Sequence, residues 1–499
     1  MSRCVALTAA AWFALASLPG ADGNARPNWP QFRGPSGSGL AAAGEKPPVE
    51  FGPGKKMLWK TALPAGHGSP SIWGDRIFLT AFVKETKTLE TIAADRRTGK
   101  ILWRRPAPAQ GIEEVHEVSS PATATVAVDG ERAYAYFGSC GLLAYDFEGR
   151  LVWSVPMPVA KAGFGAGTSP IVAGEMVLLI RDDAKDRYLL AADRRTGKTV
   201  WQQPRDVGEA LLNTTHSTPA VWNQDVIIHQ AREIVGFDLR TGARRWWLSA
   251  VTQGNGTPVV GPDAVYAGAW SPSGEPDLIV PLPEFDAIVS KYDKDGDGAF
   301  SESEFPRALP TIRRLESEGI SGATITLGTF AKTFVRADTS KDGKIDKAEW
   351  SAMVRGMSQR ITEHGMIAVK PGGEGEIGAG AVLWKEPRGV PEIPAPLVTG
   401  GRLYMVTNGG IVSTMDAKTG KLLFRGRLGA GGPYYSSPVA AAGKVYFSSG
   451  EGVVTVIQEG DRLEVAARND LGEPLYATPA LVDSKIYIRT TAHLYAFGE

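Results

Sequence analysis

The fold is decided by a nine-residue pattern whose clearest copy reads Asp193-Arg194-Arg195-Thr196-Gly197-Lys198-Thr199-Val200-Trp201. Thr-Gly suits a hairpin turn, because Gly adopts positive φ at little cost and an Asp carboxylate accepts hydrogen bonds from the turn backbone. The Trp opens the next strand, where its large ring can wedge against a neighbouring unit. Further copies run from Asp95 to Trp103, Asp238 to Trp246 and Asp416 to Phe424, with a shorter one from Asp146 to Trp153 and weaker contexts at Trp59 and Trp384.

A second repeated signal sets the number of units. A Ser-Pro or Thr-Pro pair followed by apolar residues recurs at Pro70, Pro121, Pro170, Pro219, Pro258, Pro438 and Pro479, and Ala395-Pro396 is a degenerate eighth copy. Each pair precedes a segment rich in β-formers, such as Lys444-Val445-Tyr446-Phe447. Repeats of about 40 to 50 residues with four short strands are typical of propeller blades. The sequence therefore predicts an all-β, eight-bladed β-propeller with four-stranded blades.

The two ends of the repeat array complement each other. The last unit ends at His493-Leu494-Tyr495-Ala496-Phe497 without a Trp strand, and the first Trp strand, Lys56-Met57-Leu58-Trp59, has no strands before it. We expect the N-terminal strand to complete the last blade, because closure removes the exposed sheet edge.

Composition excludes several classes of protein. The 499 residues carry 54 Lys and Arg against 54 Asp and Glu, so the formal net charge is zero. The chain therefore lacks the excess of positive charge that is typical of proteins that bind nucleic acid or an anionic membrane. The 59 Gly and 34 Pro exceed the usual shares and suit many tight turns. Two Cys cannot form a disulfide framework, a multi-Cys zinc site or a CxxC pair.

The N-terminus predicts export. Arg3 precedes an apolar run from Val5 to Leu18, followed by small residues that suit cleavage near Gly23 or Ala25. The run is short for a membrane helix, so a membrane anchor is the lesser alternative, and no later stretch is long and apolar enough to span. We expect residues 1–25 to be a signal peptide and the mature protein to be periplasmic or extracellular, with Cys140 as its one thiol.

The repeat resembles the PQQ-binding-like (quinoprotein-like) β-propeller repeat, which is shared by quinoprotein dehydrogenases and, more distantly, by the assembly lipoprotein BamB. The segment Asn28-Trp29-Pro30-Gln31-Phe32-Arg33-Gly34-Pro35 is similar to the opening of exported propeller proteins common in planctomycetes. The resemblance implies the fold and leaves the activity open, because such propellers include catalysts and scaffolds.

One repeat interval, from Pro258 to Ala395-Pro396, is about three blades long. The excess follows Ala269-Trp270 and ends before a strand around 366–369, and helical spacing appears inside it, as in Phe285-Ile288-Val289-Tyr292 and Phe330-Phe334. The sequence predicts a helical insertion in blade five. We expect an N-terminal segment at 26–54, propeller at 55–280, the insertion at 281–362 and propeller again at 363–499.

The insertion holds two matches to the twelve-residue EF-hand loop, at 293–304 and 338–349. Calcium prefers six to eight oxygen ligands, and Gly at position six permits the sharp turn. The predicted ligands of the first Ca2+ are Asp293, Asp295, Asp297, the Ala299 carbonyl and Glu304, and those of the second are Asp338, Ser340, Asp342, the Lys344 carbonyl and Glu349. A water near Ser301 completes the first ligand set. Asp346 completes the second, either directly or through a water.

The apolar residues at position eight, Phe300 and Ile345, predict that the loops pair through a short strand contact. The loops start 45 residues apart, which is longer than a compact EF-hand pair usually allows.

The residues three before each repeat proline mark the start of the inner strands and one mouth of the central channel. They include His67, His216, Asn255, Tyr435 and Tyr476, and His116 lies nearby in sequence. These six side chains are candidates for holding a cofactor or a small polar or glycan ligand. One alternative is that these side chains only form hydrogen bonds with nearby backbone groups at the start of each strand. The other is that the three His form a transition-metal site. Glu113 and Glu114 show no partner for acid-base catalysis.

From these patterns we expect an exported calcium-binding propeller that acts as a non-catalytic binding or assembly scaffold for a protein or glycan partner, as a monomer. The alternative is a PQQ-dependent oxidoreductase with its site at the channel mouth. The resemblance implies this alternative, although the chain lacks the adjacent Cys pair of alcohol-oxidising quinoproteins.

Overall fold

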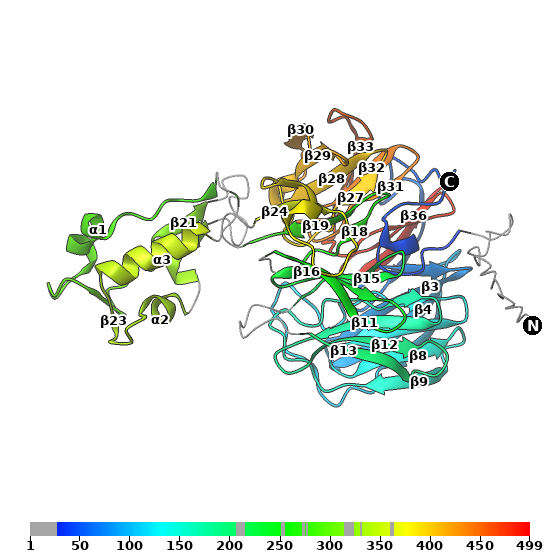
Figure 1. The fold of residues 1–499 in the computed structure, drawn as a ribbon. Helices are drawn as coiled ribbons and strands as arrows, with labels where there is room; N and C mark the ends of the chain where they lie inside the picture. The colour runs from blue at the N-terminus through cyan, green and yellow to red at the C-terminus, as the bar shows by residue number, and fades with distance from the viewer. Residues whose placement is uncertain are drawn as a thin grey trace, which may run out of the picture.

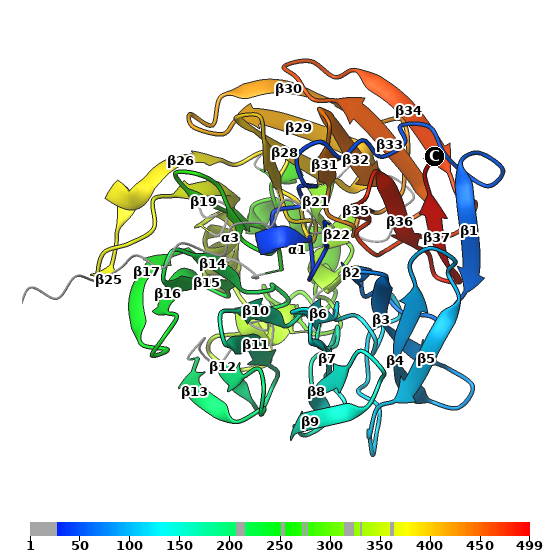
Figure 2. The same cartoon turned by 90° about the vertical axis from the view of Figure 1, so that its right-hand side faces the viewer.

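The computed structural model describes residues 27–205, 215–250, 255–271, 275, 278–313, 324–329, 332–359 and 364–499. Within them, eight antiparallel sheets stand as blades around a central axis (Figures 1 and 2), which confirms the predicted all-β, eight-bladed propeller. The expected signal peptide at 1–25 lies outside the described residues. Among the described residues, no helix is both long and apolar enough to cross a membrane.

The first four blades follow the chain in order. Blade one holds β2 (Ser71–Trp73), β3 (Arg76–Val83), β4 (Thr88–Asp95) and β5 (Ile101–Pro106); blade two holds β6 (Ala127–Val128), β7 (Arg132–Phe137), β8 (Gly141–Asp146) and β9 (Leu151–Pro156). Blade three holds β10 (Ile171–Ala173), β11 (Met176–Asp182), β12 (Arg187–Asp193) and β13 (Thr199–Pro204); blade four holds β14 (Ala220–Trp222), β15 (Asp225–Gln230), β16 (Glu233–Asp238) and β17 (Arg244–Ser249).

The other four blades complete the ring. Blade five holds β18 (Val259–Val260), β19 (Val265–Ala269), β24 (Gly365–Val369) and β26 (Val382–Glu386); blade six holds β27 (Leu397–Thr399), β28 (Arg402–Thr407), β29 (Ile411–Asp416) and β30 (Leu422–Arg427). Blade seven holds β31 (Val439–Ala441), β32 (Lys444–Ser448), β33 (Val453–Gln458) and β34 (Val465–Asp470); blade eight holds β35 (Ala480–Val482), β36 (Lys485–Arg489), β37 (His493–Phe497) and β1 (Met57–Ala62).

The N-terminal strand closes the ring as predicted. β1 pairs antiparallel with β37 and places Lys60 opposite Tyr495. Glu473, from the segment between blades seven and eight, fastens this seam by accepting hydrogen bonds from Lys60 Nζ at 3.0 Å and the Tyr495 hydroxyl at 2.8 Å. The seam therefore joins both ends of the chain to a third segment.

The Trp residues join neighbouring blades. The Nε1 atoms of Trp59, Trp103, Trp153, Trp201 and Trp384 donate to the carbonyl directly after the repeat Asp of the next blade, at 2.8 to 3.1 Å. The repeat Gly lies beneath the ring: a Cβ on Gly197 would come within 2.7 Å of Trp153. The repeat Asp holds the turn as expected, since Asp193 Oδ1 accepts from the backbone and hydroxyl of Thr196 at 2.8 and 2.7 Å.

Blade four departs from this pattern. Trp246 Nε1 donates to Asp225 of its own blade at 2.8 Å, because blade five lacks the Asp-x-x-Thr-Gly turn that would receive it. The longer connection of blade five carries β25 (Gly375–Glu376), which adds a parallel fifth strand to the outer edge of blade four. A short 3-10 turn, η6 (Ala379–Ala381), then leads into β26.

The N-terminal segment crosses one end of the channel (Figure 2), with the 3-10 turn η1 (Pro35–Gly37) drawn in blue over the centre of the ring. Trp29 bridges to Ile72 in blade one, and Leu40 bridges to Ala440 in blade seven. Between them, the fully buried Arg33 donates to the Pro396 carbonyl of blade six at 2.8 Å. This segment thus ties blades one, six and seven together.

The insertion leaves blade five between β19 and β24, whose registers pair Ala269 with Gly365. It contains α1 (Phe285–Tyr292), β20 (Phe300–Ser301), β21 (Pro310–Arg313), β22 (Thr324–Thr326), the 3-10 turn η4 (Leu327–Thr329), α2 (Thr333–Ala337), β23 (Lys344–Ile345) and α3 (Lys347–Gln359). Phe330 lies outside the described residues, and α2 begins at Thr333. The β21–β22 hairpin between the loops accounts for their unusual spacing.

Candidate functional site

The EF-hand loops lie side by side. β20 pairs antiparallel with β23, so that Phe300 lies opposite Ile345 and Ser301 opposite Lys344, as the apolar position-eight residues predicted. Both apolar side chains are fully buried in a core of the insertion's own, with the Phe300 ring 5.6 Å from that of Trp350. This core is separate from the blade cores, so the insertion is a module with its own packing.

Loop one folds around its carboxylates. The Asp293 carboxylate accepts from Gly296 N at 2.7 Å and Gly298 N at 2.9 Å, and Asp297 Oδ1 accepts from Ala299 N at 3.0 Å. Gly298, at position six, has a φ of 83°, which favours glycine. The closing Glu304 turns back into the loop and accepts from Lys294 N at 2.8 Å.

Loop two repeats the hydrogen bonds that the backbone at positions six and seven makes in loop one, and its closing Glu also turns back into the loop. Asp338 accepts from Gly343 N at 3.0 Å, Asp342 from Lys344 N at 2.9 Å, and Glu349 from Ser340 N at 2.8 Å. Ser340 also donates its hydroxyl to Asp338 at 3.3 Å, which keeps this weaker ligand beside the acids. The two loops start 45 residues apart and still fold around their carboxylates in a similar way. We therefore attribute this local fold to the loop motif.

The loops gather oxygen ligands of the kind that calcium prefers. Within the described residues, the groups of three or more candidate metal ligands are Asp293 with Asp295 and Asp297, and Asp338 with Asp342 and Glu349; in each group the ligand atoms lie within 4.8 Å of one another. All six are carboxylates, and hard oxygen donors fit Ca2+. Hydrogen bonds from Ser301 and from the loop backbone lower the pKa of Glu304 to about 2, so this carboxylate is ionised at neutral pH.

The channel-mouth candidates form two groups. The rings of His67 and Tyr476 are 4.5 Å apart, and Tyr435 lies 5.2 Å from Tyr476. On another part of the mouth, the half-exposed Phe164 lies 5.1 Å from His116 and 6.2 Å from His216.

Asn255 is half-buried ahead of β18 and takes part in none of these ring contacts. The three His are thus divided between the two groups, and the described residues show no cluster that holds all three.

Burial keeps His67 and His216 neutral. It lowers the pKa of His216 to about 4, and burial together with the nearby Arg489 cation lowers that of His67 to about 4. Sequence reasoning missed Arg489, which is fully buried and donates to the carbonyls of Gly68 at 3.1 Å and Thr80 at 2.6 Å. No motif marks Arg489, because its acceptors come from blade one.

Glu113, which shows no partner in the sequence, has partners in the fold. Its carboxylate is buried and accepts from Ala166 N at 3.1 Å. Burial raises its pKa to about 7 against the opposing effects of that hydrogen bond and of Arg181. Cys140 is also buried, which raises its thiol pKa to about 12 and disfavours the reactive thiolate.

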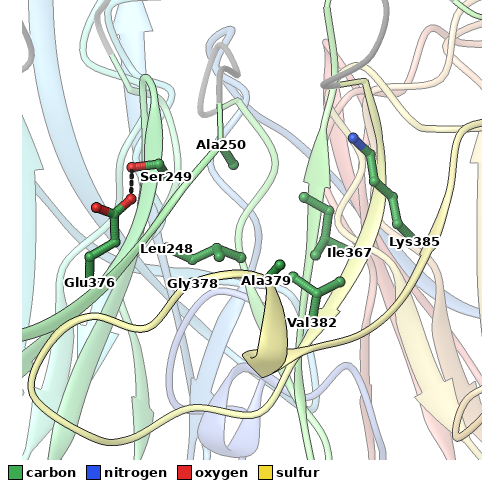
Figure 3. A pocket seen from close by; sticks show the side chains of 9 residues that line it. All are labelled: Leu248, Ser249, Ala250, Ile367, Glu376, Gly378, Ala379, Val382 and Lys385. Carbon is green, nitrogen blue, oxygen red and sulfur yellow. Dashed lines mark hydrogen bonds between the residues drawn. The ribbon is translucent and has the colours of Figure 1, made fainter.

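A pocket of about 250 Å³ lies between blades four and five (Figure 3). Leu248, Ile367 and Val382 give it apolar walls, and Glu376 at its rim is held by a 2.7 Å hydrogen bond from Ser249 Oγ. The pocket is smaller than the sites that usually bind cofactors.

Comparisons with known proteins agree with the fold and the module. The chain is similar in structure to BamB from Moraxella catarrhalis, with a TM-score of 0.51, 13% identity, and 88% of this chain and 98% of that chain covered. It is also similar to a europium-containing methanol dehydrogenase, with a TM-score of 0.56, 11% identity and coverage of 95% and 98%. For quinohemoprotein alcohol dehydrogenase from Comamonas testosteroni the TM-score is 0.55, with 12% identity and coverage of 95% and 81%.

Identities this low show the fold alone. Curated proteins offer no match to the sequence. An EF-hand family model matches residues 330–354, which contain loop two. The family model described as outer membrane protein assembly factor BamB matches residues 51–162, 90–272 and 375–462, more than half of the chain. The chain therefore belongs to the family of BamB-like, PQQ-type β-propellers.

Proposed function

We propose that this protein is an exported, calcium-binding propeller that acts as a non-catalytic binding or assembly scaffold. The observation that carries the proposal is the pair of EF-hand loops joined through Phe300 and Ile345. With calcium, Asp293, Asp295, Asp297, Glu304 and the Ala299 carbonyl would hold one ion. Asp338, Ser340, Asp342, Glu349 and the Lys344 carbonyl would hold the other.

Calcium would stabilise the insertion module rather than perform chemistry. The module rests on a small core of its own, and its loops bring several carboxylates close together. A cation that binds only the folded loops contributes its binding free energy to their folding. We therefore expect calcium to raise the stability of the module and to leave the stability of the propeller unchanged.

The placement of the module supports a role in binding. In an antiparallel blade the second strand returns to the face where the inner strand begins, so β19 ends on the mouth face. The module accordingly projects from one side of the ring, opposite the N-terminal segment (Figure 1). The same face presents Phe164, which is 50% exposed, and Val118 and Ile393, which are 39% and 40% exposed. A protein or glycan partner would contact this face beside the module.

Two measurements test the proposal on the calcium-stripped mature protein. Calorimetry with calcium should show binding in the wild type and the loss of one site in either Glu304→Gln or Glu349→Gln. In thermal unfolding, the melting temperature of the module should rise with calcium concentration. Absence of calcium heat in the wild type would overturn the calcium part of the proposal.

The alternative, PQQ-dependent oxidation at the channel mouth, is tested in the same sample. His67, Tyr435 and Tyr476 are the side chains that would contact a cofactor there. Under the scaffold proposal, PQQ gives no saturable heat and no dye-linked oxidation. Saturable PQQ binding that His67→Ala abolishes would replace the scaffold proposal with the oxidoreductase.

A further inference from the structure

The side chain of Lys344 links the two EF-hand loops. Lys344 belongs to loop two, but the β20–β23 register places it opposite Ser301 of loop one. From there its Nζ makes an ion pair and hydrogen bond with Asp297 Oδ2. Asp297 occupies position five of loop one, so its carboxylate belongs to the first group of candidate metal ligands.

This contact places two cations in competition for one carboxylate. To bind calcium, Asp297 must direct a carboxylate oxygen at the ion. A carboxylate that already pairs with an ammonium group is a poorer calcium ligand. The ion would also be repelled by the ammonium a few ångströms away, and the affinity of an EF-hand depends on the charge of its ligands. Solvent weakens the repulsion, since the side chains of Lys344 and Asp297 are 46% and 29% exposed.

We propose that Lys344 sets the calcium affinity of loop one by competing for Asp297. The inference rests on the proposed calcium function and adds a residue outside the ligand set of loop one. The same residue supplies the position-seven carbonyl of loop two, so one residue takes part in both sites. Its backbone N donates to Asp342 Oδ1 at 2.9 Å, and a side-chain substitution leaves that bond in place.

The test measures loop one by itself. In the full-length mature protein, Glu349→Gln removes the bidentate ligand of loop two, and calcium titration by calorimetry then reports loop one. Adding Lys344→Gln should lower the Kd of loop one by about threefold to tenfold, an order of magnitude set by screened charge repulsion. Lys344→Arg keeps the cation and should leave the Kd within about twofold of the Glu349→Gln parent.

Lys347→Gln is the matched control. It removes the same charge from the same loop, and Lys347 Nζ also pairs across the module, with Asp286 Oδ2 at 2.5 Å. Asp286 lies on α1 and belongs to neither ligand group. We expect this variant to change the Kd of loop one by less than about twofold, because its charge faces no ligand. High salt should shrink the effect of Lys344→Gln, because salt screens the repulsion.

The outcomes separate this inference from the function beneath it. If loop one binds calcium and Lys344→Gln changes its Kd no more than Lys347→Gln does, the competition is overturned while the calcium site stands. If loop one binds no calcium either with Lys344 or with Gln there, both the proposed site and this inference are overturned.

Discussion

Phe300 and Ile345 lie opposite each other in the β20–β23 pair, and neither side chain is exposed to solvent. The position-eight residues of the two loops therefore form the centre of the module core. Each loop is held in place by the other, because within the described part of the chain β20 and β23 pair only with each other.

Phe300→Ala should weaken both loops. Truncation of a buried Phe costs about 3–5 kcal/mol, which is large for a module with so small a core. We expect loss of calcium binding at both sites in calorimetry, and a lower melting temperature of the module with the propeller transition unchanged. Val335→Ala on α2 is the control, since Val335 is 66% exposed. Wild-type calcium affinity in Phe300→Ala would show that the loops fold independently.

Gly197→Ala should destabilise the propeller at the seam between blades two and three. A Cβ there would lie 2.7 Å from the Trp153 ring, and the φ of 72° is already unfavourable for Ala. The control Gly174→Ala has a φ of 59° and no atom within 4 Å of the added Cβ. We expect about 1 kcal/mol for the control and about 2–4 kcal/mol for Gly197→Ala, measured by urea unfolding. Equal losses would mean that the Trp contact adds nothing.

Glu113 should make the stability of the propeller fall as pH rises from about 4.5 to about 7. Its pKa rises from an ordinary 4.5 to about 7 on burial, so the folded state binds more protons than the unfolded state in this window. Glu113→Gln keeps an acceptor for Ala166 N and carries no charge. Its melting temperature should match that of the wild type near pH 4.5 and exceed it at pH 8. A difference in melting temperature between Glu113→Gln and the wild type that does not change with pH would contradict a carboxyl whose pKa is raised by burial.

The seam carboxylate Glu473 should have the opposite pH dependence. Burial opposes ionisation, but hydrogen bonds from Thr490, His493, Tyr495 and Lys60 outweigh it and lower the pKa of Glu473 to about 2. Its stabilisation is therefore present above pH 4.5 and is lost as pH falls towards 2. Glu473→Gln should cost about 1–2 kcal/mol at pH 7 and progressively less in acid, measured by chemical unfolding. A cost that stays constant with pH would contradict this role.

The repeats and loop motifs predicted much of the architecture, because each depends on contacts within one unit or between adjacent units. Asp193 and Trp201 imply a blade, and Phe300 and Ile345 imply the loop pair. What the sequence did not reveal depends on which segments meet after closure. Arg33 reaches blade six, Trp246 turns to Asp225 because the next blade lacks its turn, and Glu113 meets the loop that contains Ala166.

If the paired loops hold calcium as proposed, each chain should bind two ions. Native mass spectrometry of the full-length mature protein, dialysed against calcium after chelation, counts the ions bound to each chain. We predict two ions in the wild type, one in Glu304→Gln, one in Glu349→Gln and none in the double variant. An ion count of zero in the wild type, or one that these variants do not change, would show that the two loops are not calcium sites.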